Sequence, residues 1–303
     1  MRVAFLVSNK HMRSHPEPQV VQSASVPVRS NPLRALSYPQ FRLFWAASLV
    51  SIVGFFMTMI ARGWLMLYMT DSSFMVTAIN GVGMLPMLVF SPFGGVLADR
   101  ISRKLILIAS DAFNLVILLI LALLVITEGI QVWHVFVLSA LHGISFALGT
   151  PARASAVGSI LSHQDLPSGV ALFTTIFSSA QLVGPALAGY LINAFGMGVP
   201  FAVSCVLLVP SLILLSILRM AMPMEGLGDR HSASVLQSIT QGISYVRQHP
   251  ILTGLLMLGL SATVCAMPYQ AMLPVFARDI LGVGADGLGV MAAVGGVGAI
   301  AGS

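Results

Sequence analysis

Long apolar segments separated by short polar turns run along most of the chain after residue 40. A helix of about 20 apolar residues crosses a bilayer, because each residue advances about 1.5 Å through roughly 30 Å of hydrocarbon. None of the segments alternates apolar and polar residues, so the pattern predicts membrane-spanning helices rather than β-barrel strands. Seven full segments and an eighth that is cut short cover residues 41–69, 75–98, 105–127, 133–149, 172–195, 199–218, 251–275 and 288–303.

Composition supports an all-α integral membrane protein. Only 8% of the residues are charged and 57% are hydrophobic, and the mean hydropathy is +0.93. Soluble domains carry about 25% charged residues, which are needed to cover their surface. The net charge of +5 is spread over short runs between apolar segments, which argues against nucleic acid as a partner. The expected partners are the lipid bilayer and a small-molecule substrate, and we expect a monomer.

Basic residues are distributed unevenly between the two sides of the predicted membrane. If the N-terminus is cytoplasmic, thirteen of the fifteen Lys and Arg residues fall in cytoplasmic segments. The outer loops then hold only Arg278, and Arg62 lies within the first span. An excess of Lys and Arg on the cytoplasmic side is the usual topology signal. The sequence therefore predicts a multi-pass protein of the bacterial cytoplasmic (inner) membrane with its N-terminus inside.

The spans and the polar segments between them predict four regions. Residues 1–37 are polar and contain Pro and Ser, which predicts a disordered cytoplasmic tail. Residues 38–219 form a bundle of six helices. Residues 220–250 form a cytoplasmic linker whose second half, 234–249, spaces its apolar residues like an amphipathic helix. Residues 251–303 contain two helices of a second, incomplete bundle.

An internal repeat links the two bundles. A span, a short outer turn and a second span begin at residue 41 and again near residue 251, an offset of 210 residues. Six-helix halves repeated in parallel are a known transporter construction, and a complete pair would hold about twelve spans in about 420 residues. The chain stops inside an apolar run, so we expect a C-terminally truncated product.

The turn between the second and third spans carries the sharpest motif. It reads Gly95-Val96-Leu97-Ala98-Asp99-Arg100-Ile101-Ser102-Arg103-Lys104. An acid followed by three bases at a tight turn can form a charge network that holds one conformation closed and opens in another. Alternatively, the bases only anchor the turn to the inner leaflet.

This motif resembles the loop 2–3 signature of the major facilitator superfamily. It departs from that signature at Ser102, where the family often has glycine. The resemblance implies two six-helix halves. It also implies a conformational gate of Gly95, Asp99, Arg100, Arg103 and Lys104, in which Asp99 docks on a helix end of the other half.

The fifth span contains Gly184-Pro185-Ala186-Leu187-Ala188-Gly189. Ala180, Gly184 and Ala188 recur every four residues, which gives one small-residue face for close helix packing, and Pro185 removes a backbone hydrogen bond. This pattern is also compatible with a structural kink in an ordinary bundle. The segment resembles the antiporter motif of exporters in the superfamily, with Gly184, Pro185 and Gly189 as its key residues and Ala188 where the family often has glycine.

Three shorter stretches resemble one bacterial exporter branch. They are Gly63-Trp64-Leu65, Thr70-Asp71-Ser72 and Thr150-Pro151-Ala152-Arg153. The branch includes enterobactin-exporter and macrolide-efflux-like proteins and is also called the transmembrane secretion effectors. The resemblance covers roughly residues 33–303.

Polar residues inside predicted spans are candidate proton or substrate groups. Asp111 could carry a proton, or it could pair with Arg153 or Arg103. Arg62 could extend to the interface, or it could line a cavity and meet an anionic substrate. His142 and Gln181 could bind substrate or form hydrogen bonds between helices.

The chain contains no P-loop, nucleophile elbow, HExxH motif or clustered metal ligands. We therefore expect neither an enzyme nor a cofactor or metal, and a proton gradient as the energy source. The predicted function is secondary active export of small drug-like or siderophore-like molecules by alternating access. The alternatives are an inactive truncated fragment or a non-transporting scaffold, and then a nutrient or sugar importer.

Overall fold

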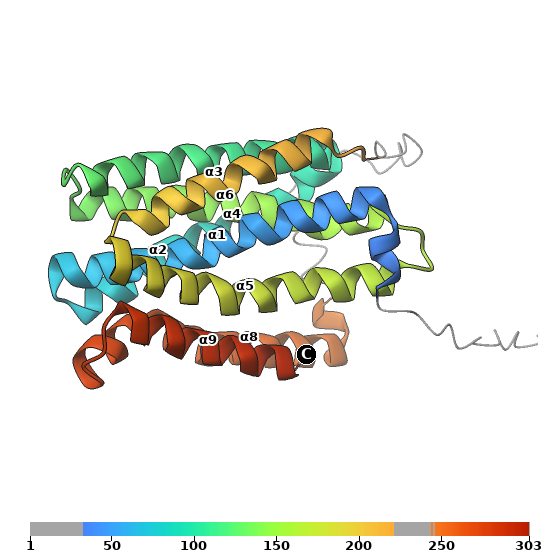
Figure 1. Cartoon of the computed structure of the whole chain (residues 1–303). Coiled ribbons are helices and arrows are strands. Elements are labelled where there is room, and N and C mark those ends of the chain that lie inside the picture. The colour runs from blue at the N-terminus through green and yellow to red at the C-terminus, as the bar shows by residue number, and fades with distance from the viewer. Residues whose placement is uncertain (1–32, 221–243, 245, 303) are drawn as a thin grey trace, which may run out of the picture. The chain divides into compact units, whose positions relative to one another are not determined.

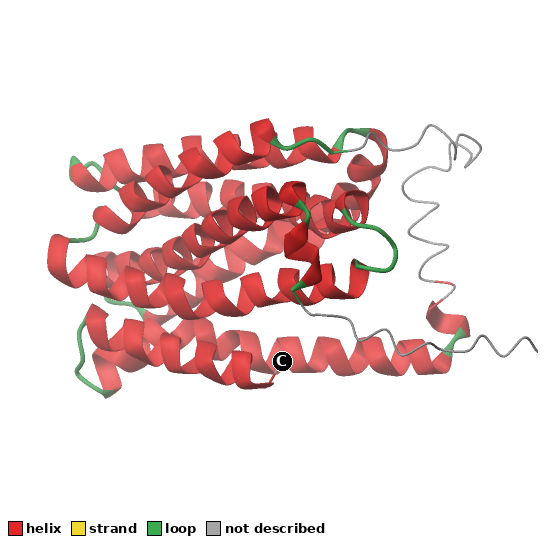
Figure 2. Ribbon diagram, turned by 45° about the vertical axis from the view of Figure 1, so that its right-hand side comes forward, coloured by secondary structure: helices red, strands yellow, loops and turns green. Residues whose placement is uncertain are grey.

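The chain folds into long helices packed side by side (Figure 1). The computed structural model describes residues 33–220, 244 and 246–302, and the described side chains exclude those of residues 87–88, 91–100, 260, 262–271, 296–297 and 299–302. Within the described residues every regular element is helical (Figure 2). In chain order they are η1 (Arg34–Ser37), α1 (Pro39–Thr70), α2 (Ser73–Arg100), α3 (Arg103–Ile126), α4 (Val132–Ile160), α5 (Leu166–Phe195), α6 (Val199–Ile217), α8 (Pro250–Val275), η2 (Phe276–Ile280) and α9 (Ala285–Gly302).

Four of these helices have proline in their first turn, and two end at a residue with positive φ. Pro39, Pro167, Pro200 and Pro250 occupy the first or second position of α1, α5, α6 and α8. Proline suits this place because the first N–H groups of a helix have no partner within it. Asp71, with φ 50°, ends α1, and Gly196, with φ 95°, ends α5. The resulting turns are short and place successive helices next to each other.

The all-α membrane fold predicted from the sequence is confirmed. Among the described residues, α1, α3, α4, α5 and α6 are each long and apolar enough to cross a membrane. Two helices extend well beyond their predicted spans: α4 continues to Ile160 and α5 already begins at Leu166. The added segment of α4, about three turns long, is stabilised by packing, since Ala152 and Ala156 are fully buried in a cluster with Phe44.

The predicted disordered tail and the structure differ at residues 34–37. These residues form the short 3-10 helix η1. Ala35 is fully buried, and its backbone N–H donates to the hydroxyl of Ser168 over 3.2 Å. Burial of one small side chain against α5 therefore orders the chain just before α1. The rest of the predicted tail and most of the predicted amphipathic helix, 234–249, lie outside the described residues.

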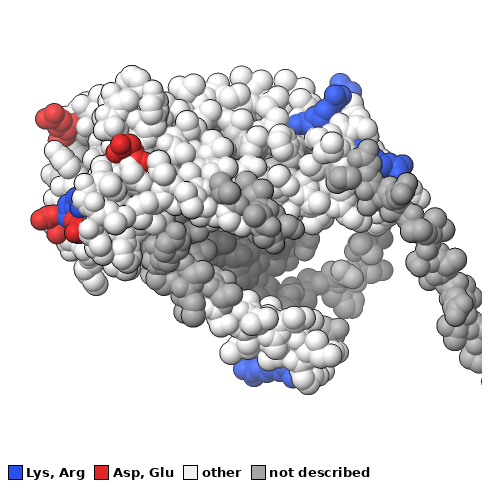
Figure 3. Space-filling view, turned by 60° about the horizontal axis from the view of Figure 1, so that its bottom comes forward, with Lys and Arg blue, Asp and Glu red and all other residues white. Residues whose placement is uncertain are grey.

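The turns at Asp71, Glu128 and Gly196 lie together at one end of the bundle, here called the Asp71 end, and the opposite end is called the Arg103 end (Figure 1). Charges differ between these ends. On the face shown in Figure 3, acidic side chains gather at one end and most basic side chains at the other. The exposed acids of the turns are Asp71, Glu128, Asp279 and Asp286.

The main helix pairs are α1 with α5 and α6, α2 with α4, α3 with α4 and α6, and α5 with α9. One apolar cluster, which includes Phe44 and Leu107, fills the Arg103 end, and a second, with Leu65 and Phe201, fills the Asp71 end. A third cluster joins Met57 on α1 and Ala188 on α5 to Leu288 on α9. Between the first two clusters, α3 carries the buried polar side chains of Ser110, Asp111 and Asn114.

Candidate functional site

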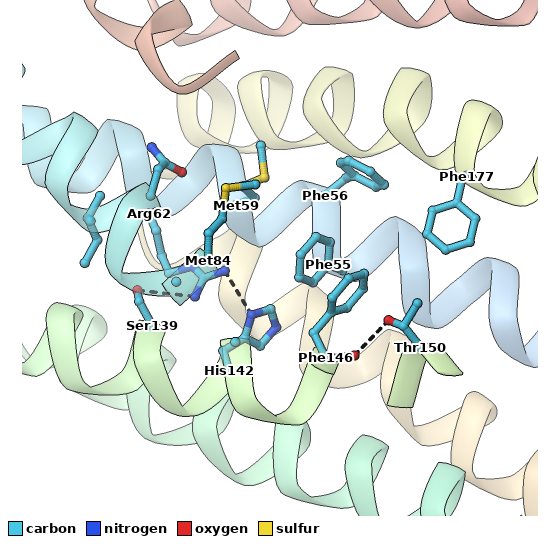
Figure 4. Close-up of a pocket in the computed structure, with 14 residues that line it drawn as sticks. Phe55, Phe56, Met59, Arg62, Met84, Ser139, His142, Phe146, Thr150 and Phe177 are labelled. Atoms are coloured by element: carbon cyan, nitrogen blue, oxygen red, sulfur yellow. Dashed lines mark hydrogen bonds between the residues drawn. The ribbon is translucent and has the colours of Figure 1, made fainter. Parts of the chain in front are cut away.

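A cavity of about 290 Å³ lies between α1, α2, α4 and α5 (Figure 4). Its lining residues recur at helical spacing, with Phe55, Met59 and Arg62 on α1. Residues three and four positions apart share one face of a helix, so each helix presents a single stripe to the cavity. Gly143 lets α2 and α4 meet closely, because a Cβ atom on Gly143 would overlap the Gly83 carbonyl.

Aromatic side chains form one wall of the cavity. The rings of Phe55 and Phe146 stack with their centroids 4.0 Å apart and their planes at 19°. Phe55 also stacks on the His142 imidazole at 5.2 Å and 11°. Offset or stacked rings at such distances attract one another beyond simple area burial. The wall is therefore a flat aromatic surface with a polar ring at one edge.

Arg62 lies in the cavity wall and is only 7% exposed. Its Nε donates to the Thr58 carbonyl over 3.2 Å, and Nη1 donates to the Ser139 hydroxyl over 3.3 Å. Arg62 lies eight residues before the end of α1, which is about 12 Å of helix. Arg62 therefore lines the cavity, which was one of its two alternatives, and its side chain does not extend to the Asp71 end.

His142 faces Arg62 from α4 and is 2% exposed. The Nη2 group of Arg62 lies 3.0 Å from Nδ1 of His142. A guanidinium can only donate, so Nδ1 accepts and the imidazole proton resides on Nε2. His142 thus forms the hydrogen bond between helices and also lines the cavity. The hydrogen bond between helices is one of the two alternatives considered for it, and substrate binding stays a prediction.

Asp111 forms a buried ion pair with Arg153, as one of the sequence alternatives stated. Asp111 on α3 is fully buried and Arg153 on α4 is 5% exposed. The carboxylate also accepts hydrogen bonds from Ser51 on α1, over 3.1 Å, and from Ser211 on α6, over 2.8 Å. Several donors on one buried carboxylate offset the cost of taking its charge out of water. The ion pair and its two serine partners therefore connect α1, α3, α4 and α6.

The structure describes only part of the loop 2–3 motif. The side chains of Asp99 and Arg100 and the surroundings of Gly95 lie outside what is described. Arg103 donates through Nη1 to the Ser155 carbonyl on α4 over 3.1 Å, and Lys104 donates to the Ser216 carbonyl near the end of α6. A cation at a helix C-terminus is favourable because the last carbonyls carry partial negative charge. These two bases therefore join the ends of α3, α4 and α6.

The glycines of the fifth-span motif face two different helices. A Cβ atom on Gly184 would lie 2.7 Å from Cβ of Phe56 on α1. A Cβ atom on Gly189 would overlap the Ala285 carbonyl and lie 2.9 Å from Gly289 on α9. Pro185 is buried between them, and a Cβ atom on Gly289 would lie 3.1 Å from its carbonyl oxygen. The motif therefore brings α5 into close contact with α1 on one side and with α9 on the other.

An ion pair also connects α1 to the segment after α8. Arg278 in η2 contacts Asp71 and Asp279, and it donates to the Leu67 carbonyl over 3.3 Å. Hydrogen bonding by Asp279 and then Asp71 raises the pKa of Arg278. The single base predicted for the outer loops thus pairs with two acids at the Asp71 end.

Comparison with known protein families matches residues 30–303 to the transmembrane secretion effectors. The chain belongs to this family of the major facilitator superfamily. The resemblance inferred from the sequence motifs is therefore confirmed. It follows that the chain is a multi-pass membrane protein, and that its family consists of transporters rather than enzymes.

The curated relatives of this transporter family are longer than the chain. Macrolide efflux protein A of Streptococcus pyogenes is 25% identical over 243 residues, which cover 79% of this chain and 59% of the relative. Multidrug efflux pump Tap of Mycolicibacterium fortuitum is 27% identical over 241 residues, 75% of this chain and 57% of that protein. An uncharacterized MFS-type transporter, YfiS of Bacillus subtilis, is 28% identical over 174 residues, 57% of this chain and 40% of YfiS. The chain thus spans somewhat more than half the length of the efflux relatives that it matches.

Sequence reasoning missed the aromatic wall and the serine partners of Asp111. Phe55 and Phe146 look like ordinary membrane residues in the sequence, and Ser51 and Ser211 stand alone in apolar runs. The available signal was helical spacing, because Phe146 follows His142 by one turn. Gln181, which the sequence grouped with His142, is half-buried on α5 and is not among the residues that line this cavity.

Proposed function

We propose that the protein is a secondary active transporter that exports small, largely apolar molecules by alternating access. The observation that carries this proposal is the cavity between α1, α2, α4 and α5, which combines an aromatic wall with the buried polar pair Arg62 and His142. Ligand sites are typically apolar cavities with a few placed polar groups. Family membership and relatives named as efflux proteins support export over import.

In this proposal two sets of helices rock about the cavity, and the contacts between them form and break in each cycle. Gly189 against Ala285, and Arg278 against Asp71, are among the described contacts between α1–α6 and the later helices that such a motion would change. The loop 2–3 residues Asp99 and Arg100 would form the corresponding gate at the opposite end. An orientation with the N-terminus in the cytoplasm would place that gate on the inner face.

We further propose that a proton gradient drives export and that Asp111 carries the proton. A proton on Asp111 would remove the negative charge that pairs with Arg153 on α4. The contact between α3 and α4 would then weaken. Proton binding and conformational change would be coupled by this one pair.

Efflux measurements test the proposal. Bacteria that lack their own drug pumps would be loaded with a fluorescent apolar dye, and the dye loss would be followed with and without a protonophore. We expect the protein to accelerate dye loss, the protonophore to stop it, and Asp111→Asn to abolish it. Asp286→Asn, at an exposed acid, serves as the matched control. Proton-driven efflux that persists unchanged in Asp111→Asn would show that Asp111 is not the proton carrier.

The alternative proposal is a membrane scaffold that does not transport. Purified protein of residues 1–303, reconstituted into vesicles with an imposed pH gradient, separates the two proposals. Movement of dye across these vesicles would exclude the non-transporting alternative. Dye retention in vesicles that contain folded protein would favour it.

A further inference from the structure

Two arginines are buried in the middle of the bundle, and their surroundings differ. Arg153, 5% exposed, is neutralised by Asp111. Arg62, 7% exposed, has no carboxylate partner among the described side chains. The described ion pairs use Asp111, Asp165, Asp71 and Asp279 for other bases. A buried charge is expensive unless an opposite charge accompanies it, so Arg62 is a candidate to meet an opposite charge on a bound molecule.

The described hydrogen bonds of Arg62 and His142 leave hydrogen-bond donors for a bound molecule. The guanidinium has five N–H groups, and the described bonds to Thr58, Ser139 and His142 use three of them. Because Nδ1 of His142 accepts from Arg62, its Nε2 carries a hydrogen. The described partners thus leave two guanidinium N–H groups and one imidazole N–H group for an acceptor. A cation placed here would meet both a fixed positive charge and further donors.

The rest of the cavity suits a flat apolar body. Figure 4 shows Arg62, Ser139 and His142 grouped at one end of the site, with Thr150 and Phe177 toward the other. The stacked rings of Phe55 and Phe146 lie between these groups and offer a π surface. The Thr150 hydroxyl donates to the Phe146 carbonyl, so its hydrogen-bond donor is already satisfied within α4. Polarity in the cavity is therefore concentrated at the Arg62 end.

We propose that the substrates of this cavity are aromatic compounds that carry an anionic, acceptor-rich group such as a carboxylate. The anionic group accepts from Arg62 and from Nε2 of His142, and the ring stacks beside Phe55 and Phe146. Bidentate guanidinium–carboxylate bonds are among the strongest hydrogen bonds in proteins. This inference rests on the proposed export function and specifies the chemistry of its substrates.

A matched series of three naphthalenes tests this inference by equilibrium dialysis at pH 7. The probes are 2-naphthoate, which is anionic, 2-naphthylmethanol, which is neutral, and 2-naphthylmethylamine, which is cationic. The protein of residues 1–303 is kept in an uncharged maltoside detergent, so that no lipid headgroup competes as an anion. We expect 2-naphthoate to bind about tenfold more tightly than the alcohol, because hydrogen bonds to a charged group add about 1–1.5 kcal/mol, and the amine to bind more weakly than either.

Three variants test whether the preference for the anionic probe depends on Arg62. Arg62→Gln should reduce the affinity for 2-naphthoate to that for the alcohol and leave alcohol binding unchanged, which also shows that the variant is folded. Arg62→Lys should keep part of the preference for the anion, since it retains the charge without the planar donor pair. Arg42→Gln removes an exposed arginine from the same helix and should change nothing.

The outcomes separate this inference from the proposed function. Equal binding of the three probes, or tightest binding of the amine, would overturn the anion preference and leave the export proposal standing. An anion preference that survives in Arg62→Gln would overturn the role of Arg62. Binding of none of the probes would overturn both the inference and the assignment of this cavity as the substrate site.

Discussion

Arg153 on α4 donates through Nη2 to Oδ1 of Asp111 on α3, and Ser51 lies within 3.1 Å of both side chains. The carboxylate thus receives hydrogen bonds from three helices while it is fully removed from solvent. Such a pair contributes specificity as much as stability, since each partner depends on the other for its charge balance. It also fixes how far α3 and α4 can separate without breaking a buried interaction.

Removing one member of this pair should cost more than removing both. Asp111→Asn leaves Arg153 buried without a counter-charge, and we expect a loss of about 3–5 kcal/mol in the free energy of unfolding. Thermal unfolding in detergent, followed by tryptophan fluorescence, measures the effect. The double variant Asp111→Leu with Arg153→Met should recover much of the loss. Asp279→Asn, at an exposed pair with Arg278, should cost at most about 1 kcal/mol. Equal losses for Asp111→Asn and Asp279→Asn would contradict the charge argument.

Gly189 should tolerate no side chain. Gly189→Ala would force α9 away from α5, because the new Cβ atom would overlap the Ala285 carbonyl. Overpacking of this kind costs about 1–3 kcal/mol, and the unfolding midpoint should fall accordingly. Gly81→Ala is the matched control on α2, where nothing lies within 4 Å of the new atom. There the better helix propensity of alanine should stabilise the protein by up to about 1 kcal/mol. A rise of the midpoint in both variants would mean that α5 and α9 do not meet at Gly189.

Asp165 should make stability depend on pH at the Arg103 end. The Tyr38 hydroxyl donates to its carboxylate over 2.7 Å, and Ser162 and Arg34 add further contacts. The hydrogen bond from Tyr38 is the main cause that lowers the pKa of Asp165 below its ordinary 3.8. A depressed carboxyl pKa stabilises the folded state above the ordinary value, and this stabilisation is lost as the pH falls through the folded-state value.

The variant Tyr38→Phe tests this dependence. Its unfolding midpoint should lie below that of the unmodified protein at pH 7, and the difference should shrink as the pH falls below 3.8. Tyr190→Phe, at an exposed tyrosine of α5, provides the control and should show no such change with pH. A difference between Tyr38→Phe and the unmodified protein that stays constant from pH 7 to below 3.8 would rule out the linkage.

Phe146 should contribute to ring binding without affecting charge preference. Phe146→Ala removes the partner that stacks on Phe55 at 4.0 Å. Aromatic pairs contribute about 0.5–1.5 kcal/mol, so affinities for all three naphthalene probes should fall by about fivefold. Phe195→Ala, at an exposed ring near the end of α5, should leave them unchanged. A loss confined to 2-naphthoate would place the ring elsewhere in the cavity.

The positions of the helices were predictable because a bilayer imposes a length and a composition on every span. The predicted span 251–275 differs from α8 by one residue, and 105–127 differs from α3 by two at most. The errors occur where apolar length was not the deciding factor. The segment of α4 beyond Gly149, about three turns long, is less apolar than the predicted span and is held by the burial of Ala152 and Ala156.

The membrane environment, the order of the spans and the family could be read from the sequence, because apolar length and local motifs are properties of neighbouring residues. The surroundings of each buried polar residue depended on how the helices pack. Asp111 and Arg153 are 42 positions apart, and Arg62 and His142 are 80 apart. Helix packing brings these side chains together, and a buried charge is stable only with the partners that packing supplies. The same packing places Arg62, and not Gln181, in the cavity wall, which a count of polar residues along the chain could not reveal.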